Sequence, residues 1–329
     1  MKRIAINGFG RIGRAALKVI MEEPDLQVVA VNDLMSIDNA KYLLKYDSVY
    51  GIYDKDVDIR DGHLQVGGQK ILYLNQRDPE QLPWKENNID IVIESTGFFT
   101  NREDAEKHIH AGATNVVISG PTKSKDTPTV VHGVNTSEGK TAIFSCASCT
   151  TNNISPVVEI LGRTIGIKKA ILNTIHAYTA SQTLVDAPSK KNPRMGRAGA
   201  VNLTPTSTGA AIATTKALPQ YEGKFDGVAV RTPVPVGSIS DVTFVAERNT
   251  TAEEINEILQ KEAKTDRYLK VLDVTYEPIV SSDIQQSPYA AIVDASMTRV
   301  VDGDLVKLMI WYDNEWGFTN QMIRQILEL

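Results

Sequence analysis

A cysteine and a histidine in the middle of the chain have the types and neighbours that nucleophilic catalysis requires. Cys149 is surrounded by hydroxyl and amide side chains in the run SCTTN, and His176 follows in a second polar run, HAYT. A thiol attacks only as its thiolate, so its pKa must fall from about 8.5, and a helix N-terminus or a nearby imidazole favours that change. The pair therefore predicts Cys149 as a nucleophile and His176 as its base.

The start of the chain carries the spacing of a dinucleotide-binding loop. Gly8, Gly10 and Gly13 form a Gly-x-Gly-x-x-Gly run. The first glycine allows a tight turn, the second lets a pyrophosphate approach the backbone, and the third lets a helix pack closely on a sheet. Asp33 lies about 20 residues further on, where a carboxylate accepts ribose hydroxyls and repels a 2′-phosphate. This pattern favours NAD as the cofactor.

A nucleophilic cysteine combined with NAD indicates one chemistry above others, the oxidation of an aldehyde through a thioester. The Cys-x-x-Cys spacing of Cys146 and Cys149 also permits a redox or a metal site. A metal would need more thiol or imidazole ligands than this pair supplies, and a thioredoxin-like dithiol would open the first helix of its fold. We therefore expect no metal, and we expect Cys146 to be a small buried side chain.

The elements that would position the glycine loop alternate between strands and helices. Residues 3–7 and 26–31 are expected strands, and residues 11–22 carry apolar positions at helical spacing. This order opens a doubly wound parallel sheet, whose ligands bind where the strands end. Further strands are expected over residues 89–94 and 115–118. The turn residues after them are therefore candidates for the cofactor site: Ser95, Thr96, Gly97 and Ser119.

The chain after Cys149 has a different texture, which predicts a mixed or antiparallel sheet. Residues 179–201 form a polar segment with little periodicity. Polar residues after Cys149 suit a helix start, but Pro156 predicts a kink or a later start for that helix. Strands are expected over residues 167–178, 228–236, 240–246 and 305–312, and helices over residues 251–263 and 320–329. One more strand is expected just before Cys149, over residues 141–144.

Length and charge limit the classes of function. A chain of 329 residues exceeds what one hydrophobic core usually supports, which predicts two domains. The formal net charge of -5 gives no support for a dedicated nucleic-acid partner. No apolar run approaches the roughly 18 residues of a membrane span, and Asn7 and Gly8 interrupt the apolar start. We therefore expect a cytoplasmic protein with no membrane partner.

A second group of residues has the side chains that bind phosphate. Arg194 lies in the polar segment, Thr208 and Gly209 lie in a run rich in hydroxyls, and Arg231 ends an expected strand. Arginine and threonine together suit phosphate recognition, because their donors match the oxygens of the anion. Taken singly, each arginine, Arg11 included, suits a surface position equally well.

These residues together resemble the phosphorylating glyceraldehyde-3-phosphate dehydrogenase family over essentially the whole chain. The resemblance is carried, in order, by NGFGRIGR at 7–14, ND at 32–33, ESTG at 94–97, ASCTTN at 147–152, HAYT at 176–179, PTSTGAA at 205–211 and WYDNE at 311–315. It implies an α/β fold, with a Rossmann doubly wound parallel sheet and an α+β catalytic domain built on a mainly antiparallel sheet. The implied domains are residues 1–148, with a helix at about 315–329 packing back on them, and residues 149–314.

The resemblance implies the oxidative phosphorylation of D-glyceraldehyde 3-phosphate to 1,3-bisphosphoglycerate with reduction of NAD, in glycolysis and gluconeogenesis. Cys149 would form the hemithioacetal and thioacyl intermediates, and His176 would be the general base. Glyceraldehyde 3-phosphate and inorganic phosphate are the implied partners, in a homotetramer. Two alternatives stay open: a hydrolytic erythrose-4-phosphate dehydrogenase, and a non-catalytic role such as RNA binding in the dinucleotide cleft.

The resemblance also implies the contacts of each ligand. Thr179 and Arg231 would hold the C3 phosphate of the substrate. The attacking phosphate would be held by Ser148, Thr208, Gly209 and Arg194, with Thr150 in the same phosphate-binding set. Asn314 would orient the nicotinamide carboxamide. The remaining implied cofactor contacts are Gly8, Gly10, Arg11, Ile12, Gly13, Asp33, Ser95, Thr96, Gly97 and Ser119.

The segment 179–201 resembles the family's S-loop, which in a tetramer touches the cofactor of the neighbouring subunit. The chain departs from the common pattern at Cys146, Asn153, Ser181, Ala187 and Phe318. Asn153 stands where many members carry a second cysteine, so the possible oxidised forms differ. Ser181 replaces a frequent Asp near the phosphate site, and Phe318 replaces a frequent Tyr. Ala187 replaces a frequent Leu, and this smaller side chain lowers the barrier to NADP. Pro188 is kept, and Asp33 still opposes NADP.

Overall fold

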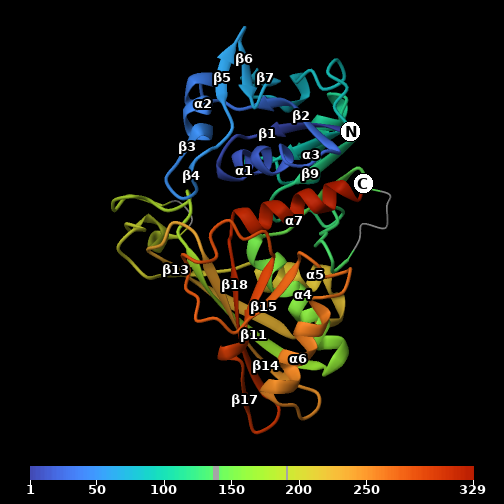
Figure 1. The fold of residues 1–329 in the computed structure, drawn as a ribbon, viewed down its shortest axis with the longest axis vertical. Helices are drawn as coiled ribbons and strands as arrows, with labels where there is room; N and C mark the ends of the chain where they lie inside the picture. Colours follow the sequence, from blue (N-terminus) through green and yellow to red (C-terminus); the bar gives the residue numbers. More distant parts are fainter. Residues whose placement is uncertain (136–140, 190–191) are drawn as a thin grey trace. The chain divides into compact units, whose positions relative to one another are not determined.

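The computed structural model describes residues 1–135, 141–189 and 192–329, and it divides into two compact units. Unit 1 comprises Met1–Val130, Thr136–Ala147 as far as it is described, and Met322–Leu329. Unit 2 comprises Val131–Asn135 and Ser148–Gln321. Each unit is built on its own large sheet, and both sheets can be followed in Figure 1.

Unit 1 contains an eight-stranded sheet in the order β10-β9-β8-β1-β2-β7-β6-β5. Its strands are parallel from β10 to β7, and the β5–β6–β7 edge is antiparallel. The strands are β1 (Lys2–Asn7), β2 (Leu26–Asn32), β5 (Val57–Arg60), β6 (His63–Val66), β7 (Gln69–Leu74), β8 (Ile91–Glu94), β9 (Asn115–Ile118) and β10 (Ile143–Ser145). Unit 1 also contains α1 (Arg11–Ile20), α2 (Ile37–Lys45), η1 (Pro79–Gln81), α3 (Arg102–His110) and the small β3 (Tyr46–Asp47) and β4 (Gly51–Ile52) pair.

The strand order of unit 1 reverses between β1 and β8. The chain runs from β1 to its neighbour β2 on one side and only later returns to place β8 on the other side. All four residues of β8 are buried, as expected for a strand inside a parallel sheet whose two faces are covered. In such sheets, ligands bind at the carboxyl ends of the strands beside the reversal point. The sheet therefore places a ligand site where β1 and β8 end.

Unit 2 contains a second eight-stranded sheet, in the order β12-β13-β11-β14-β18-β16-β15, with β17 paired to β18. Pairs β11–β13 and β15–β16 are parallel and the other pairs are antiparallel. The strands are β11 (Ile167–Ala177), β12 (Thr204–Ser207), β13 (Phe225–Thr232), β14 (Ser238–Ala246), β15 (Leu272–Thr275), β16 (Ala291–Asp294), β17 (Arg299–Val301) and β18 (Leu305–Tyr312). The helices are α4 (Cys149–Thr164), α5 (Ala210–Ala217) and α6 (Ala252–Glu262), with short turns η2 (Pro193–Gly196), η3 (Pro219–Tyr221) and η4 (Ala295–Met297). Helix α7 (Trp316–Leu327) belongs to unit 2 as far as Gln321 and to unit 1 from Met322 on.

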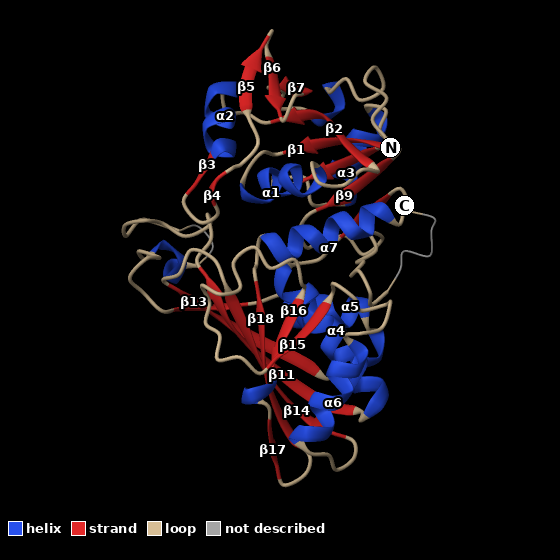
Figure 2. Cartoon of the chain, viewed as in Figure 1, coloured by secondary structure: helices blue, strands red, loops and turns tan. Residues whose placement is uncertain are grey.

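Helices cover one face of the unit 2 sheet. Figure 2 shows α4, α5 and α6 on the same side of the strands, and α4 contacts β11, β14, β16 and β18. Along β14, buried and half-buried residues alternate without exception, which is the pattern of a strand with one covered face. The fold class predicted from the sequence, a doubly wound parallel sheet plus a mainly antiparallel α+β sheet, is confirmed by these two sheets.

Two element predictions were wrong, and both involve proline. Helix α4 begins at Cys149 and continues through Pro156, so the later start that this residue predicted, as the alternative to a kink, is wrong. A proline inside a helix costs about 3 kcal/mol, but nearly every residue from Thr150 to Leu161 is buried, and this packing outweighs the cost. Strand β13 ends at Thr232 instead of continuing to residue 236, because Pro233 and Pro235 have no N–H to donate to a ladder.

Within the described ranges, none of the helices has both the length and the apolar character needed to cross a membrane.

Candidate active site

Cys149 is the first residue of α4, where the helix presents its positive end. Ser148 caps this helix, because its Oγ accepts a hydrogen bond of 3.1 Å from the backbone N–H of Thr151. Ala147 has a φ of 59°, an unusual value for a residue with a side chain, at the turn between β10 and α4. Cys149 is half-buried, whereas Cys146 is buried, as expected from the sequence. The local turn therefore presents the Cys149 thiol at a helix N-terminus.

His176 faces this thiol from the end of β11. Its Nε2 lies 3.4 Å from Sγ of Cys149, so the S–H group can donate to the ring. Its Nδ1 lies 2.7 Å from the carbonyl oxygen of Ala177. When Nδ1 carries the proton and donates to that carbonyl, Nε2 has a free lone pair for the proton of the thiol. The structure thus brings together the predicted nucleophile and the predicted base.

Arg231 lies beside His176 because β13 pairs in parallel with β11, with these two residues in register. Its NH1 is 2.5 Å from Nδ1 of His176 and 3.3 Å from the carbonyl oxygen of Ala177. Its Nε is buried without a hydrogen-bond partner among the described residues. A buried donor of this kind is costly unless an acceptor meets it, so the arginine has capacity to bind an anion.

Burial and the Arg231 charge set the protonation of the pair. Burial raises the pKa of the Cys149 thiol, while Arg231 and the hydrogen bonds of Thr150 oppose that rise. Burial, and then Arg231, lower the pKa of His176 to about 3. The imidazole is therefore neutral near pH 7 and able to accept a proton. Burial alone raises the pKa of Cys146 to about 12, which makes that thiol unreactive.

Tyr312, at the end of β18, holds the two catalytic elements together and was not singled out by the sequence. Its hydroxyl is 2.8 Å from Oγ1 of Thr150 and 2.8 Å from Oγ1 of Thr174. Its ring meets the His176 ring edge-on, with 6.0 Å between centroids. Tyr312 therefore fixes the first turn of α4 to β11, and only its place in the run WYDNE hinted at this role.

Asn314 is oriented by residues of β14 and the turn before it. Its Oδ1 accepts from the hydroxyl of Ser238 at 3.0 Å and from the N–H of Gly237 at 3.2 Å. The same Ser238 hydroxyl accepts from the N–H of Ala177 at 3.1 Å. Because Oδ1 is occupied, Nδ2 of Asn314 is the atom left to meet a carboxamide oxygen. Ser238 thus links Asn314 to the strand of His176, a role that no local sequence signal indicated.

The predicted phosphate residues lie in unit 2, on several different elements. Oγ1 of Thr179 is 2.8 Å from Oγ of Ser181, so the departure at Ser181 still gives Thr179 a hydroxyl partner. Thr208 accepts from the N–H of Ala210 at 3.1 Å, and Gly209 is the N-cap of α5. Arg194 lies in η2 with an exposed side chain, within a predicted S-loop whose residues 190–191 are outside the described ranges.

The glycine loop of unit 1 has room for a dinucleotide. Gly8 has a φ of 96°, and a Cβ on Gly13 would lie 2.1 Å from the carbonyl oxygen of Gly8, so neither position accepts a side chain. A Cβ on Gly10 would meet no atom within 4 Å, which leaves open space over the turn. Gly10 is also the N-cap of α1, and the first turn of that helix has no acidic residue. This arrangement suits a pyrophosphate at a helix N-terminus.

The other predicted cofactor residues surround this loop within unit 1. Oδ2 of Asp33 accepts from the N–H of Phe9 at 2.6 Å, which ties the acid to the glycine turn. The Ser95 hydroxyl donates to the carbonyl oxygen of Gly8 at 2.7 Å, and the N–H of Ser119 donates to the carbonyl of Glu94 at 2.9 Å. Ile12 is half-buried, Gly97 has a φ of 75°, and Arg11 pairs with Asp47 at 2.6 Å.

Asn153, the position that often carries a second cysteine in the resembled family, is buried under β18. Its Nδ2 donates to the carbonyl oxygens of Ala290 and Trp311, each at 3.2 Å. Across the ranges that the structure describes, no group of three or more His, Cys, Asp or Glu side chains could hold a metal ion.

Comparison with known proteins finds two family models that match this chain. The model of the glyceraldehyde 3-phosphate dehydrogenase NAD binding domain matches residues 2–102, and that of the C-terminal domain matches residues 148–314. A glyceraldehyde-3-phosphate dehydrogenase of Clostridium pasteurianum is 44% identical, covering 99% of this chain and 98% of the relative. The chloroplastic glyceraldehyde-3-phosphate dehydrogenase A of Chlamydomonas reinhardtii is 45% identical, with 98% and 87% covered. The glyceraldehyde-3-phosphate dehydrogenase of Geobacillus stearothermophilus is 43% identical, with 98% and 96% covered.

Proposed function

We propose, because this chain belongs to the glyceraldehyde 3-phosphate dehydrogenase family, that it oxidises D-glyceraldehyde 3-phosphate to 1,3-bisphosphoglycerate with inorganic phosphate and NAD, as in glycolysis. The observation that carries the proposal is the 3.4 Å approach of Cys149 Sγ to Nε2 of His176 at the start of α4. A thiol beside a neutral imidazole is the arrangement that covalent aldehyde chemistry requires.

The first step is formation of a hemithioacetal. Nε2 of His176 takes the thiol proton, and the thiolate of Cys149 forms a C–S bond to the aldehyde carbon. The backbone N–H of Cys149 and the newly protonated imidazole stabilise the developing oxyanion. The substrate's phosphate draws Arg231 away from Nδ1, and Nδ1 then donates to the Ala177 carbonyl, 2.7 Å away. This tautomer is the one in which Nε2 is a base.

Oxidation and release complete the cycle. NAD, when bound, supplies the acceptor for the hydride that leaves the hemithioacetal carbon. Gly8, Gly10 and Gly13 cradle its pyrophosphate, Asp33 accepts its ribose hydroxyls, and Nδ2 of Asn314 orients its carboxamide. An oxygen of inorganic phosphate then bonds to the thioester carbon, the C–S bond breaks, and the thiolate of Cys149 is regenerated.

Two anion sites serve these steps. Arg231 and Thr179 hold the C3 phosphate of the substrate, and the unpartnered buried Nε of Arg231 supports that role. The attacking phosphate is held by Ser148, Thr150, Thr208, Gly209 and Arg194. Ser148 already uses its Oγ to cap α4, so it offers the phosphate a hydroxyl whose position the helix sets.

The decisive test measures NADH formation with glyceraldehyde 3-phosphate, with and without inorganic phosphate, and with NADP as a parallel cofactor. Strong reduction of NAD that requires phosphate is the expected result. Reduction that ignores phosphate would instead identify a hydrolytic enzyme of the erythrose-4-phosphate dehydrogenase type. Absence of reduction with either cofactor would contradict the proposal.

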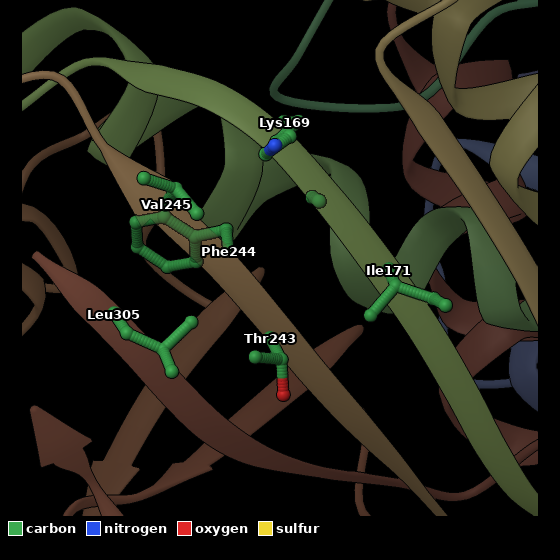
Figure 3. Close-up of a pocket in the computed structure, with 7 residues that line it drawn as sticks. Lys169, Ile171, Thr243, Phe244, Val245 and Leu305 are labelled. Atoms are coloured by element: carbon green, nitrogen blue, oxygen red, sulfur yellow. The ribbon is translucent and has the colours of Figure 1, made fainter. Parts of the chain in front are cut away.

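We also propose that residues 1–148 together with a C-terminal helix form the NAD-binding domain, and residues 149–314 the catalytic domain, of a cytoplasmic homotetramer. The uncovered face of the unit 2 sheet supports assembly, because Ile171 is 60% exposed and Leu305 is 41% exposed there. Figure 3 shows both side chains beside Thr243 and Val245, in a pocket formed by β11, β14 and β18. Leu184, in the predicted S-loop, is 82% exposed. Exposed apolar side chains that share one face of a sheet favour contact with another subunit.

A further inference from the structure

A fully buried polar cluster lies at the reversal point of the unit 1 sheet, and the proposed chemistry does not use it. It consists of Asn7 at the end of β1, Glu94 at the end of β8, His108 of α3 and Trp84 of the loop before β8. Each of the four side chains is at most 1% exposed. Polar side chains this deeply buried destabilise a protein unless every donor and acceptor is satisfied.

The partners of His108 determine which ring nitrogen carries its proton. The indole Nε1 of Trp84 lies 3.0 Å from Nδ1, and an indole can only donate. Nδ1 must therefore accept, so the proton of the neutral ring is on Nε2. Nε2 lies 3.1 Å from Oε2 of Glu94, and its N–H donates to that oxygen. If both ring nitrogens carried a proton, the N–H group at Nδ1 would face the N–H donor of Trp84.

Glu94 accepts hydrogen bonds from donors on several segments of unit 1. Its Oε2 accepts from His108 and, at 2.6 Å, from Nδ2 of Asn7. Its Oε1 accepts from the backbone N–H of Thr96 at 2.8 Å and also from the Thr96 hydroxyl. A carboxylate has the acceptor capacity for all four bonds. Glu94 is thus fixed in one orientation by donors from β1, α3 and its own loop.

The loop that Glu94 fixes is in direct contact with the glycine turn. A Cβ on Gly8 would lie 2.5 Å from the backbone N of Thr96, so these two segments leave no room for adjustment. Ser95 and Gly8 are joined by the 2.7 Å hydrogen bond from the serine hydroxyl. Oδ1 of Asn7 accepts from Nδ2 of Asn32 at 2.7 Å, beside Asp33. The chain of contacts therefore runs from Trp84 to both edges of the dinucleotide loop.

We propose that His108 and Trp84 are positioning residues for the dinucleotide site, which act by holding Glu94 so that Thr96 and Asn7 brace the turn at Gly8. Neither residue touches the cofactor in this scheme. Its effect is pre-organisation: a turn that is already in its binding geometry loses less freedom when a ligand binds. The inference rests on the proposed NAD-dependent function and names the residues that support its cofactor site.

The test compares His108→Leu, His108→Gln and the wild type by calorimetric titration of NAD into the purified full-length chain. Leucine removes the donor to Glu94, and we expect NAD to bind about tenfold more weakly, because the loosened turn must then be ordered when the ligand binds. Glutamine retains an N–H that reaches towards Glu94, so it should restore most of the affinity. His110→Gln is the matched control, because this histidine of the same helix is exposed. Its Nδ1 lies 3.4 Å from Oε1 of Glu80, which is not part of the buried cluster.

Steady-state kinetics separates positioning from general damage to the fold. The KM for NAD should rise in His108→Leu while the KM for glyceraldehyde 3-phosphate and the alkylation rate of Cys149 stay at wild-type values. Trp84→Phe removes the indole donor together with part of a buried ring, and it frees His108 to move its proton, so it should weaken NAD binding in the same direction. Its effect should be non-additive with that of His108→Leu, because both act through Glu94.

The possible failures are distinct from one another. A wild-type chain that binds no NAD would overturn the proposed function itself. A wild type that binds NAD, with His108→Leu and Trp84→Phe equal to it, would overturn only the positioning role. A rise of both KM values together would also overturn it, since that result reports a loosened fold. If His108→Leu does not fold, Trp84→Phe decides the question by the same titration.

Discussion

At the scale of single residues, the two cysteines show how burial separates chemistry from packing. Cys146 and Cys149 lie in one short run, yet only Cys149 is half-exposed and faces an imidazole, at 3.4 Å. Burial raises the pKa of the Cys146 thiol to about 12. Reactivity is therefore a property of the position in the fold and not of the residue type.

Replacing Cys149 by serine is predicted to abolish phosphate-dependent reduction of NAD, by at least about a thousandfold, because the hydroxyl is a far weaker nucleophile at the same site. Iodoacetamide should label the native chain once, at Cys149, as read by peptide mass spectrometry. Cys146→Ala is the control and should keep both the activity and the label. Labelling of Cys146 in the native chain at a similar rate would contradict this assignment.

Arg231 is predicted to set the pH dependence of the thiol. Its positive charge opposes the rise in the pKa of Cys149 that burial causes, so Arg231→Gln should raise this pKa further. The thiolate would then form only at higher pH. In alkylation of the free protein by iodoacetamide, the rate should therefore climb at a higher pH in the variant than in the wild type. If the alkylation rate of the variant rises at the same pH as that of the wild type, Arg231 does not act on the thiol.

At the scale of elements, pairing between strands places residues that are far apart in the sequence. The antiparallel β11–β14 pair brings Ser238 near Ala177, and its hydroxyl also meets Asn314 after β18. One serine therefore couples the strand of the base to the residue proposed to orient the nicotinamide. Local sequence does not reveal this link, because it depends on the registers of three strands.

Ser238→Ala is predicted to raise the KM for NAD and to lower kcat, each by up to about tenfold, because Asn314 loses the hydroxyl that holds its amide. Ser240→Ala is the matched control on the same strand. The Ser240 hydroxyl is buried with no partner among the described residues, so its removal should be neutral or stabilising. Equal kinetic effects in the two variants would argue against the role of Ser238.

The Arg11–Asp47 pair is predicted to contribute to stability above acid pH. Burial pushes the pKa of Asp47 up, but Arg11 and the N–H groups of Val49 and Tyr50 outweigh it and hold the pKa below its usual range. The contribution is then present above the unfolded pKa of about 3.9 and is lost as pH falls through the folded value.

Asp47→Asn should therefore lower the free energy of unfolding by roughly 1–2 kcal/mol near pH 7, with the difference from the wild type shrinking below about pH 4. Urea unfolding curves of the variant and the wild type, recorded at several pH values, measure this difference. A difference that stays constant down to pH 3 would contradict the predicted ionisation of Asp47.

At the scale of the whole molecule, the two sheets have different exposures. In unit 1 every residue of the central strand β8 is buried, whereas the unit 2 sheet leaves apolar side chains such as Ile171 on its uncovered face. Each unit supplies a different part of the proposed reaction: the glycine loop and Asp33 from one, Cys149 and His176 from the other. The exposed face of unit 2 supports the proposal that further chains cover it.

Ile171→Glu is predicted to dissociate the proposed tetramer into smaller species. The charge would have to be buried where another subunit covers this apolar face, and burying a charge is costly. Size-exclusion chromatography with light scattering gives the mass directly. Leu269→Glu is the control, since Leu269 is 54% exposed but lies off the sheet. A wild-type chain that elutes as a monomer would end the assembly proposal.

The sequence alone determined the features that depend on near neighbours. The glycine turn and Asp33 after β2 follow from local backbone preferences, and these act within a few residues. The run of family motifs was sufficient to predict both the fold class and the reaction. The prediction failed at Pro156, where the local cost of proline was outweighed by packing that no local rule contains.

Only the tertiary structure decided the geometry of the site. The Cys149–His176 distance, the register that sets Arg231 beside His176, and the parts played by Tyr312 and Ser238 depend on pairing between distant strands. The same holds for His108, whose tautomer follows from Trp84 and Glu94. Burial is the largest influence on the pKa of Cys149 and of His176. It arises only when the whole sheet and its helices pack, so the order of residues in the sequence does not reveal it.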